Sequence, residues 1–241
     1  MLHGLVDRWI GRCSDWIKVR YGLGRRSLAN DLARTASKNT LFLLHVGCGP
    51  ATIRNIPVAG FQSLAWHEVR FDADAAVAPD ITGTMTDLSA IPDSFADAIY
   101  SSHNIEHLYP HEVPVALAEF YRVLKPAGFL VVTCPDLQSL CRLVVEDKLD
   151  EMAYLSAMGP IAPIDVLYGH RQAMAAGNLF MAHHNGFTLK TLKSSLVEAG
   201  FAAVEGFQRS ENLDLWALAS KSPRSHNEMS DLAKEYLVAI P

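Results

Sequence analysis

Two glycines flank a cysteine directly after an apolar run, in the order Gly47, Cys48, Gly49. Because glycine has no Cβ atom, it adopts positive φ angles and lets a ligand lie close to the backbone. Asp72 closes the next apolar segment, about 20 residues further on, where a carboxylate can accept hydrogen bonds from both hydroxyls of a ribose. Asp74 lies close enough to compete for that role. A tight turn without a ligand is the alternative for the glycines alone.

Histidines recur at four-residue steps at His103, His107 and His111. On an unbroken helix this spacing places three imidazoles on one face, where they could hold a metal ion. Pro110 argues against such a helix, because proline removes a backbone donor and clashes with the preceding turn. We therefore predict no metal site from this spacing, and a metal remains the alternative. Glu106 could hold a neighbouring histidine or a backbone amide.

A third polar set lies in a long insertion at 136–187, and it comprises Arg171, Asn178, His183 and His184. This set suits a polar or anionic substrate, with Arg171 as the partner of a carboxylate or phosphate. The alternative is a lid that covers the bound ligand and turns its polar residues toward water. An insertion of this length is seldom without function in a compact domain.

Strands alternate with helices from residue 41 onward. The predicted strands are 41–46, 67–71, 80–84, 97–101, 128–133, 202–207 and 214–219. Pro114 suits the first turn of one helix, and Thr188 can cap another. The pattern predicts an α/β fold with a doubly wound, Rossmann-like and mostly parallel sheet of seven strands. Pro57 and Gly60 shorten the first crossover helix.

Composition indicates an ordinary globular protein. The chain has 241 residues, four cysteines and a formal net charge of −5. This charge gives no general reason to expect nucleic acid. The cysteines form no CxxC pair, which favours a reducing compartment, and no apolar stretch approaches the roughly 20 residues that span a bilayer. We predict a cytoplasmic protein.

The first 40 residues differ from the remainder, with eight Lys or Arg against three Asp. Apolar residues recur there at three- and four-residue steps, which predicts an amphipathic helical appendage. It could pack on the main domain, on a second subunit or on a membrane surface. The predicted boundaries are 1–40 for this segment, 41–220 for the main domain and 221–241 for a C-terminal tail.

Five stretches occur in the order "HVGCGPA", "RFDAD", "TDLSAIP", "FADAIYSSHNIEHL" and "FYRVLKPAGFLVVTCPD". Together they resemble the class I S-adenosylmethionine-dependent methyltransferases, close to the type 11 branch. The resemblance covers about 41–135 and departs from the family pattern at Ala51, where a third glycine is usual. It implies S-adenosylmethionine as cofactor and a small-molecule, saccharide or lipid-precursor acceptor that is methylated at oxygen or nitrogen. The helix and two strands up to residue 219 fit the family's closing antiparallel pair, which implies an antiparallel C-terminal strand.

The resemblance also implies which residues hold the cofactor. Gly47, Cys48 and Gly49 would lie against its methionine part, and Asp72 would bind its ribose. Asp87 and the Leu88 backbone would meet the adenine. Ser102 and His103 would line the pocket near the methionine portion.

Methyl transfer from a sulfonium mainly requires that the nucleophile be aligned with the methyl group. A hydroxyl or ammonium acceptor also needs a base. His107 is the candidate base, because it follows the strand that faces the methyl group and imidazole titrates near neutral pH. Glu106 would orient that segment. The alternative is that His107 only packs or caps the short helix.

Other functions remain alternatives. A nicotinamide-dependent dehydrogenase shares the fold, but its fingerprint requires glycine or alanine where Thr52 stands. A non-catalytic protein could retain the fold and the pocket. A nucleic-acid methyltransferase is disfavoured by the acidic main domain, although the basic N-terminal segment keeps RNA open.

Overall fold

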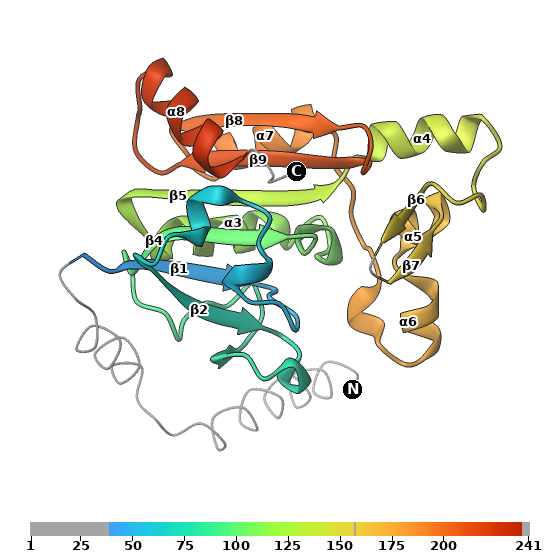
Figure 1. The fold of residues 1–241 in the computed structure, drawn as a ribbon, viewed down its shortest axis with the longest axis horizontal. Helices are drawn as coiled ribbons and strands as arrows, with labels where there is room; N and C mark the ends of the chain where they lie inside the picture. The colour runs from blue at the N-terminus through green and yellow to red at the C-terminus, as the bar shows by residue number, and fades with distance from the viewer. Residues whose placement is uncertain (1–38, 157, 238–241) are drawn as a thin grey trace, which may run out of the picture. The chain divides into compact units, whose positions relative to one another are not determined.

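The computed structural model describes residues 39–156 and 158–237 (Figure 1). The predicted N-terminal helix lies outside the described residues. None of the described helices is both long and apolar enough to cross a membrane.

Seven strands form one sheet in the order β3-β2-β1-β4-β5-β9-β8. Their bounds are β1 Leu41–Val46, β2 Trp66–Asp72, β3 Ile81–Thr82, β4 Ala96–Ser102, β5 Leu124–Pro135, β8 Ala203–Arg209 and β9 Asp214–Ser220. Strand β9 runs antiparallel to both of its neighbours, whereas the pairs from β3 to β5 are parallel. The predicted fold class is confirmed, down to the antiparallel C-terminal strand.

Helices α3 (Val113–Val123) and α7 (Leu189–Glu198) lie behind the sheet in Figure 1. Pro114 lies in the first turn of α3, and Thr188 caps α7 by accepting a hydrogen bond from the Thr191 amide, as predicted. The apolar stripes of both helices are buried, because they pack against one face of the sheet and exclude water from it.

The opposite face lacks a regular first crossover helix. The chain instead forms two short 3-10 turns, η1 Ile53–Asn55 and η2 Ala59–Gln62. The expected C-terminal tail contains helix α8 (His226–Tyr236), which packs on the same face. Met229 and Tyr236 there join a core cluster with Phe61 and Phe129.

The predicted insertion lies beyond the carboxyl ends of the parallel strands (Figure 1). It folds as α4 Leu137–Val145, β6 Tyr154–Ser156, β7 Gly159–Ile161, α5 Pro163–Tyr168, α6 Arg171–Ala175 and η5 Leu179–Met181. Leu140, Ile161 and Val166 form its own small core. Two further turns, η3 Ala75–Val77 and η4 Ile105–His107, follow β2 and β4 at this edge of the sheet.

Candidate functional site

The turn after β1 and the end of β2 meet at one point. Gly47 and Gly49 have φ angles of +64° and +53°, which glycine adopts without strain. The Gly49 amide donates a hydrogen bond of 2.7 Å to Oδ2 of Asp72. The Asp74 amide donates to Oδ1 of Asp72, whereas the Asp74 carboxylate caps η3. Asp72, and not Asp74, therefore faces the glycine turn.

The Arg70 side chain stabilises this turn through hydrogen bonds to its backbone. The sequence analysis did not predict this role. The Arg70 guanidinium donates to the carbonyl oxygens of Gly49 and Ala51 at 2.6 and 3.1 Å. It also donates to the carbonyls of Val77 and Ala78. Arg70 thus links the loops that follow β1 and β2, and its donors face backbone rather than a ligand.

The two glycines have different surroundings. A Cβ atom on Gly47 would lie 2.0 Å from Oδ1 of Asn104, whose amide donates to the carbonyls of Val46, Gly47 and Ser102. A Cβ atom on Gly49 would meet nothing within 4 Å. The open side of the turn is therefore at Gly49, next to the Asp72 carboxylate. Gly47 provides room for a side chain of the protein itself.

The predicted adenine contacts are partly engaged within the protein. The Leu88 amide donates to Oε2 of Glu119 at 2.8 Å, and the Leu88 side chain is fully buried. The Asp87 carboxylate accepts from the Ser89 amide at 2.9 Å. The Leu88 amide, part of the backbone expected to meet the adenine, is thus engaged with Glu119. Ser102 pairs its hydroxyl with that of Thr133.

Cys48 does not act as a reactive thiol here. It is buried, and burial raises its pKa to about 11. Because the thiolate is the nucleophilic form, Cys48 serves as a small apolar side chain in the turn.

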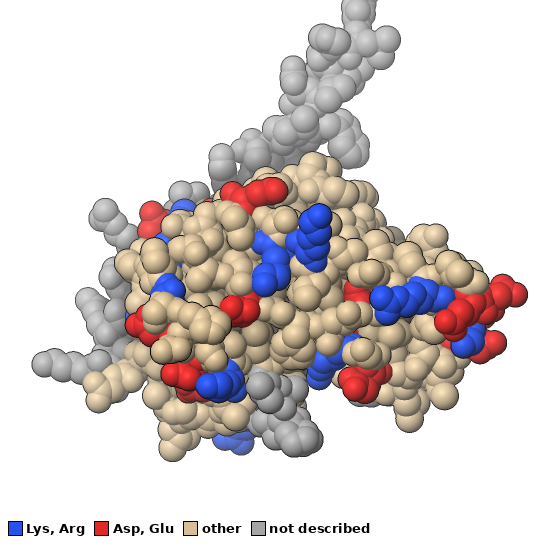
Figure 2. Space-filling model, turned by 90° about the horizontal axis from the view of Figure 1, so that it is seen from above, with Lys and Arg blue, Asp and Glu red and all other residues tan. Residues whose placement is uncertain are grey.

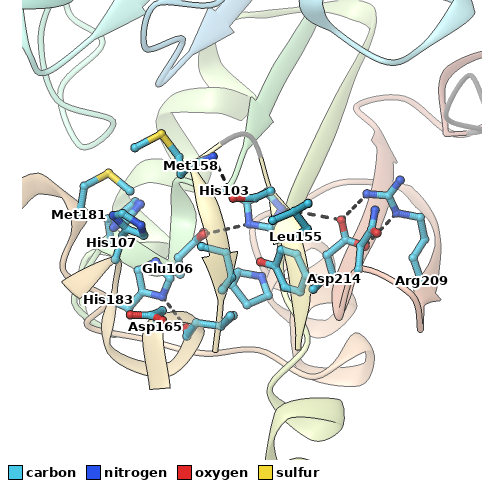
Figure 3. A pocket seen from close by; sticks show the side chains of 17 residues that line it. His103, Glu106, His107, Leu155, Met158, Asp165, Met181, His183, Arg209 and Asp214 are labelled. Carbon is cyan, nitrogen blue, oxygen red and sulfur yellow. Dashed lines mark hydrogen bonds and ion pairs between the residues drawn. The ribbon is translucent and has the colours of Figure 1, made fainter. Parts of the chain in front are cut away.

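A cavity of about 440 Å³ lies between the sheet edge and the insertion (Figure 3). Its polar lining includes His103, Glu106 and His107 from the segment after β4 and His183 of the insertion. Asp165, Arg209 and Asp214 also line it. Its apolar part comes from insertion side chains that include Leu155, Met158 and Met181.

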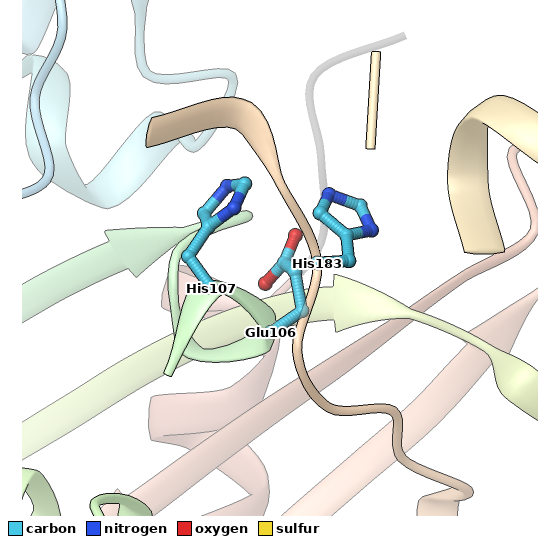
Figure 4. Close-up of side chains that lie close together, drawn as sticks. All are labelled: Glu106, His107 and His183. Atoms are coloured by element: carbon cyan, nitrogen blue, oxygen red, sulfur yellow. The ribbon is translucent and has the colours of Figure 1, made fainter. Parts of the chain in front are cut away.

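Glu106, His107 and His183 form a compact cluster at the polar end of this cavity (Figure 4). The end of the insertion brings His183 there, because the amides of His184 and Asn185 both donate to the Glu106 carbonyl. The rings of His107 and His183 lie 4.7 Å apart, measured between centroids. Burial lowers the pKa of His183, which favours its neutral form at pH 7.

His103 lies between two buried carboxylates. Its Nδ1 is 3.4 Å from Oε1 of Glu106, and its Nε2 is 3.7 Å from Oδ2 of Asp214. Desolvation opposes the charged imidazole, although the His103 side chain is 44% exposed. The carboxylates of Asp214 and Glu106 outweigh desolvation and raise the pKa of His103 to about 9. Arg209 donates to both oxygens of Asp214. The sequence analysis missed Asp214 and Arg209, because they lie on β9 and β8, far along the chain.

Of the four predicted substrate residues, only His183 lines the cavity. Arg171 pairs instead with Asp165 at 2.7 Å and Asp150 at 3.0 Å. Asn178 precedes η5 and is exposed, and the His184 ring stacks on Tyr109. The charge of Arg171 is thus balanced within the insertion and is not directed at this cavity.

Comparisons with known proteins agree with this architecture. Residues 44–132 match the family described as a methyltransferase domain. The probable methyltransferase ltbC of Aspergillus luteorubrus is 30% identical over 116 residues, which are 39% of each chain. The family match covers less than half of the chain, and it agrees with the resemblance stated from the sequence motifs.

One solved structure supports the fold, and a second has a lower TM-score. The CMeT domain of the citrinin polyketide synthase has a TM-score of 0.52 and 12% identity, over 81% of this chain and 50% of that one. A SAM-dependent methyltransferase from Archaeoglobus fulgidus has a TM-score of 0.49 and 16% identity, over 86% and 99% of the two chains. The chain spans 39% of the length of the curated relative named above.

The match to a methyltransferase domain agrees with S-adenosylmethionine as the expected cofactor. The residues present fit it at the glycine turn. Gly49 leaves open space beside its backbone, and the Asp72 carboxylate next to it can accept ribose hydroxyls. The bound cofactor supplies an electrophilic methyl group.

Proposed function

We propose that the protein transfers a methyl group from S-adenosylmethionine to an oxygen or nitrogen of a small-molecule acceptor held in the 440 Å³ cavity. The observation that carries this proposal is the position of the cavity. It lies at the same edge of the sheet as the glycine turn, and His103 lines it while following the strand next to that turn. Ligands of open α/β sheets bind at this edge.

The cluster at the polar end of the cavity would remove the acceptor proton. His107 donates Nδ1–H to the Ala182 carbonyl at 2.9 Å, since a carbonyl oxygen can only accept. In the neutral ring, Nε2 then carries a lone pair that can take the proton. Glu106 would favour the resulting imidazolium through its negative charge, because it is 1% exposed and adjacent in the chain.

The size and lining of the cavity support a small acceptor. Ligand cavities of about 300–1,000 Å³ with mainly apolar walls and a few polar groups are typical of small-molecule sites. Figure 2 shows acidic and basic side chains interspersed over the described part of the face that it draws. Such a distribution supports a small molecule over a nucleic acid, which needs a cationic track.

Calorimetric titration of S-adenosylmethionine tests the cofactor site. Asp72→Ala is expected to weaken binding about tenfold or more, since it removes the acceptor of the ribose hydroxyls. Asp74→Ala is the matched control and should bind nearly as the unaltered protein does. Equal affinity of all three proteins would contradict the ribose assignment.

Incubation with methyl-labelled cofactor and fractionated metabolites tests the reaction. Label is expected in a small-molecule fraction, and the unaltered protein is compared with His107→Gln. Cofactor binding without transfer to any fraction would instead identify a non-catalytic protein that retains the domain.

A further inference from the structure

Glu106 is an unusual buried carboxylate. It is 1% exposed, and neither of its oxygens has a hydrogen-bond partner. The nearest charged group is Nδ1 of His103, which is 3.4 Å from Oε1 and so too far for a strong hydrogen bond. A buried carboxylate normally accepts several hydrogen bonds or binds a cation, because its desolvation is otherwise uncompensated. His103 compensates this charge only in part, and both carboxylate oxygens can accept a further ligand.

The two imidazoles beside it have the same unused atom. Nδ1 of His107 donates to the Ala182 carbonyl, and Nδ1 of His183 donates to the Val166 carbonyl at 2.7 Å. These two bonds fix the neutral tautomer in which Nε2 carries the lone pair. A backbone carbonyl on the other ring nitrogen is the support that metal-binding histidines usually have.

One ligand atom from each of Glu106, His107 and His183 lies within 4.8 Å of the others. Metal bonds of about 2.0–2.2 Å need ligand atoms no more than about 4.3 Å apart, so small side-chain rotations would close the cluster around an ion. Figure 4 shows the carboxylate between the two rings. We propose that these three side chains bind one divalent transition-metal cation at the polar end of the cavity.

The donor set indicates the kind of cation. Two imidazole nitrogens and one carboxylate suit Zn²⁺, Mn²⁺, Fe²⁺ or Co²⁺, whereas Mg²⁺ and Ca²⁺ prefer oxygen ligands. The sequence analysis considered His103, His107 and His111 and predicted no metal. The structure replaces that spacing with a different set, because His183 arrives from the insertion, 76 residues after His107 in the printed numbering.

A cation here would change the role of His107. Its Nε2 lone pair would be a ligand and no longer a base. Three protein ligands leave coordination positions open toward the cavity, where an acceptor hydroxyl could bind. The cation would lower the pKa of that hydroxyl, and its proton would pass to solvent. The oxygen would then bond to the methyl carbon while the carbon–sulfur bond breaks and S-adenosylhomocysteine leaves. This step rests on the proposed function, whereas the binding of the cation does not.

The experiment is a calorimetric titration of the untagged, chelator-treated full chain with Zn²⁺ and with Co²⁺. We expect one cation per chain and, with Co²⁺, the visible absorption of a low-coordinate nitrogen and oxygen site. His183→Gln and His107→Gln should each weaken binding about tenfold or more. His184→Gln is the matched control, because its ring stacks on Tyr109 outside the cavity, and it should bind as the unaltered chain does.

Circular dichroism and S-adenosylmethionine titration of the same variants separate the possible failures. Absent or non-stoichiometric binding by the folded chain would overturn the cation site, as would Zn²⁺ binding that His183→Gln does not weaken. Mg²⁺ binding as tight as Zn²⁺ binding would overturn the nitrogen ligand set. Failure to bind S-adenosylmethionine, with cation binding intact, would overturn the proposed function alone.

Discussion

Asp214 illustrates how a single residue is tuned by its neighbours. It is buried at the start of β9, where it accepts hydrogen bonds from Arg209 and from the Trp216 indole. Burial alone would raise its pKa, but Arg209 and His103 outweigh burial and lower the pKa of Asp214 to about 2. The local sequence around Asp214 does not predict this network. Arg209 meets Asp214 only because β8 and β9 pair, and His103 comes from the segment after β4.

The lowered pKa of Asp214 predicts acid sensitivity. The carboxylate stabilises the fold above its unfolded pKa of 3.8, and the effect is lost as the pH falls from about 4 to about 2. The shift corresponds to about 2 kcal/mol. Urea unfolding at pH 7 and at pH 3 should show that Asp214→Asn removes this part of the pH dependence. An unchanged slope of stability against pH in the variant would contradict the assignment.

Arg171 was predicted to bind substrate, but its position in the structure leads us to expect little effect on turnover. Its guanidinium is held by Asp165 and Asp150 and does not line the cavity. We expect Arg171→Ala to change kcat/KM by less than about twofold, because no contact with substrate is lost. His183→Gln, assayed beside it, should reduce turnover strongly. A large loss of turnover in Arg171→Ala, with cofactor affinity unchanged, would restore the substrate role that the sequence suggested.

At the scale of single elements, the position of His183 depends on how the last segment of the insertion packs against Gly169. Gly169 follows α5 with φ +102° and pairs with Ala182 in an isolated bridge. A Cβ atom there would lie 1.9 Å from the Met181 carbonyl oxygen. The bridge directly precedes His183, so the close approach at Gly169 helps to position the imidazole that enters the cavity.

Gly169→Ala should therefore loosen the insertion without unfolding the sheet. Strain at positive φ costs about 1–2 kcal/mol, and the clash adds to it. Hydrogen exchange should become faster over 170–187 while β1 to β5 stay protected. Gly177→Ala is the control, since its φ is +97° but its Cβ would meet nothing within 4 Å. Equal exchange in the two variants would show that the clash has no effect.

At the scale of the described domain, α8 compensates for the shortened first crossover. Tyr236 is 7% exposed, and its ring centroid lies 4.9 Å from that of Phe61 and 4.6 Å from that of Phe129. The Gly60 backbone allows this approach, because a Cβ there would lie 2.5 Å from the Tyr236 ring. The C-terminal helix thereby covers sheet surface that a regular crossover helix would otherwise bury.

Tyr236→Ala should lower the free energy of unfolding by about 3 kcal/mol or more, as is usual when a large aromatic ring is removed from a core. Tyr236→Phe keeps the ring and should cost at most about 1 kcal/mol. Denaturant unfolding of both variants measures this difference. A loss well below 1 kcal/mol for Tyr236→Ala would mean that α8 contributes little to the core.

The amino-acid sequence alone determined the sheet, its antiparallel last strand and the meeting of Gly49 with Asp72. These features follow from local apolar periodicity and from motifs that act within one or two elements, so a linear reading detects them. The tertiary structure alone decided that His183, and not Arg171, joins Glu106 and His107, and that Arg209 and Asp214 hold His103. Those contacts depend on where a long insertion and distant strands arrive in space, which residue type and spacing do not encode.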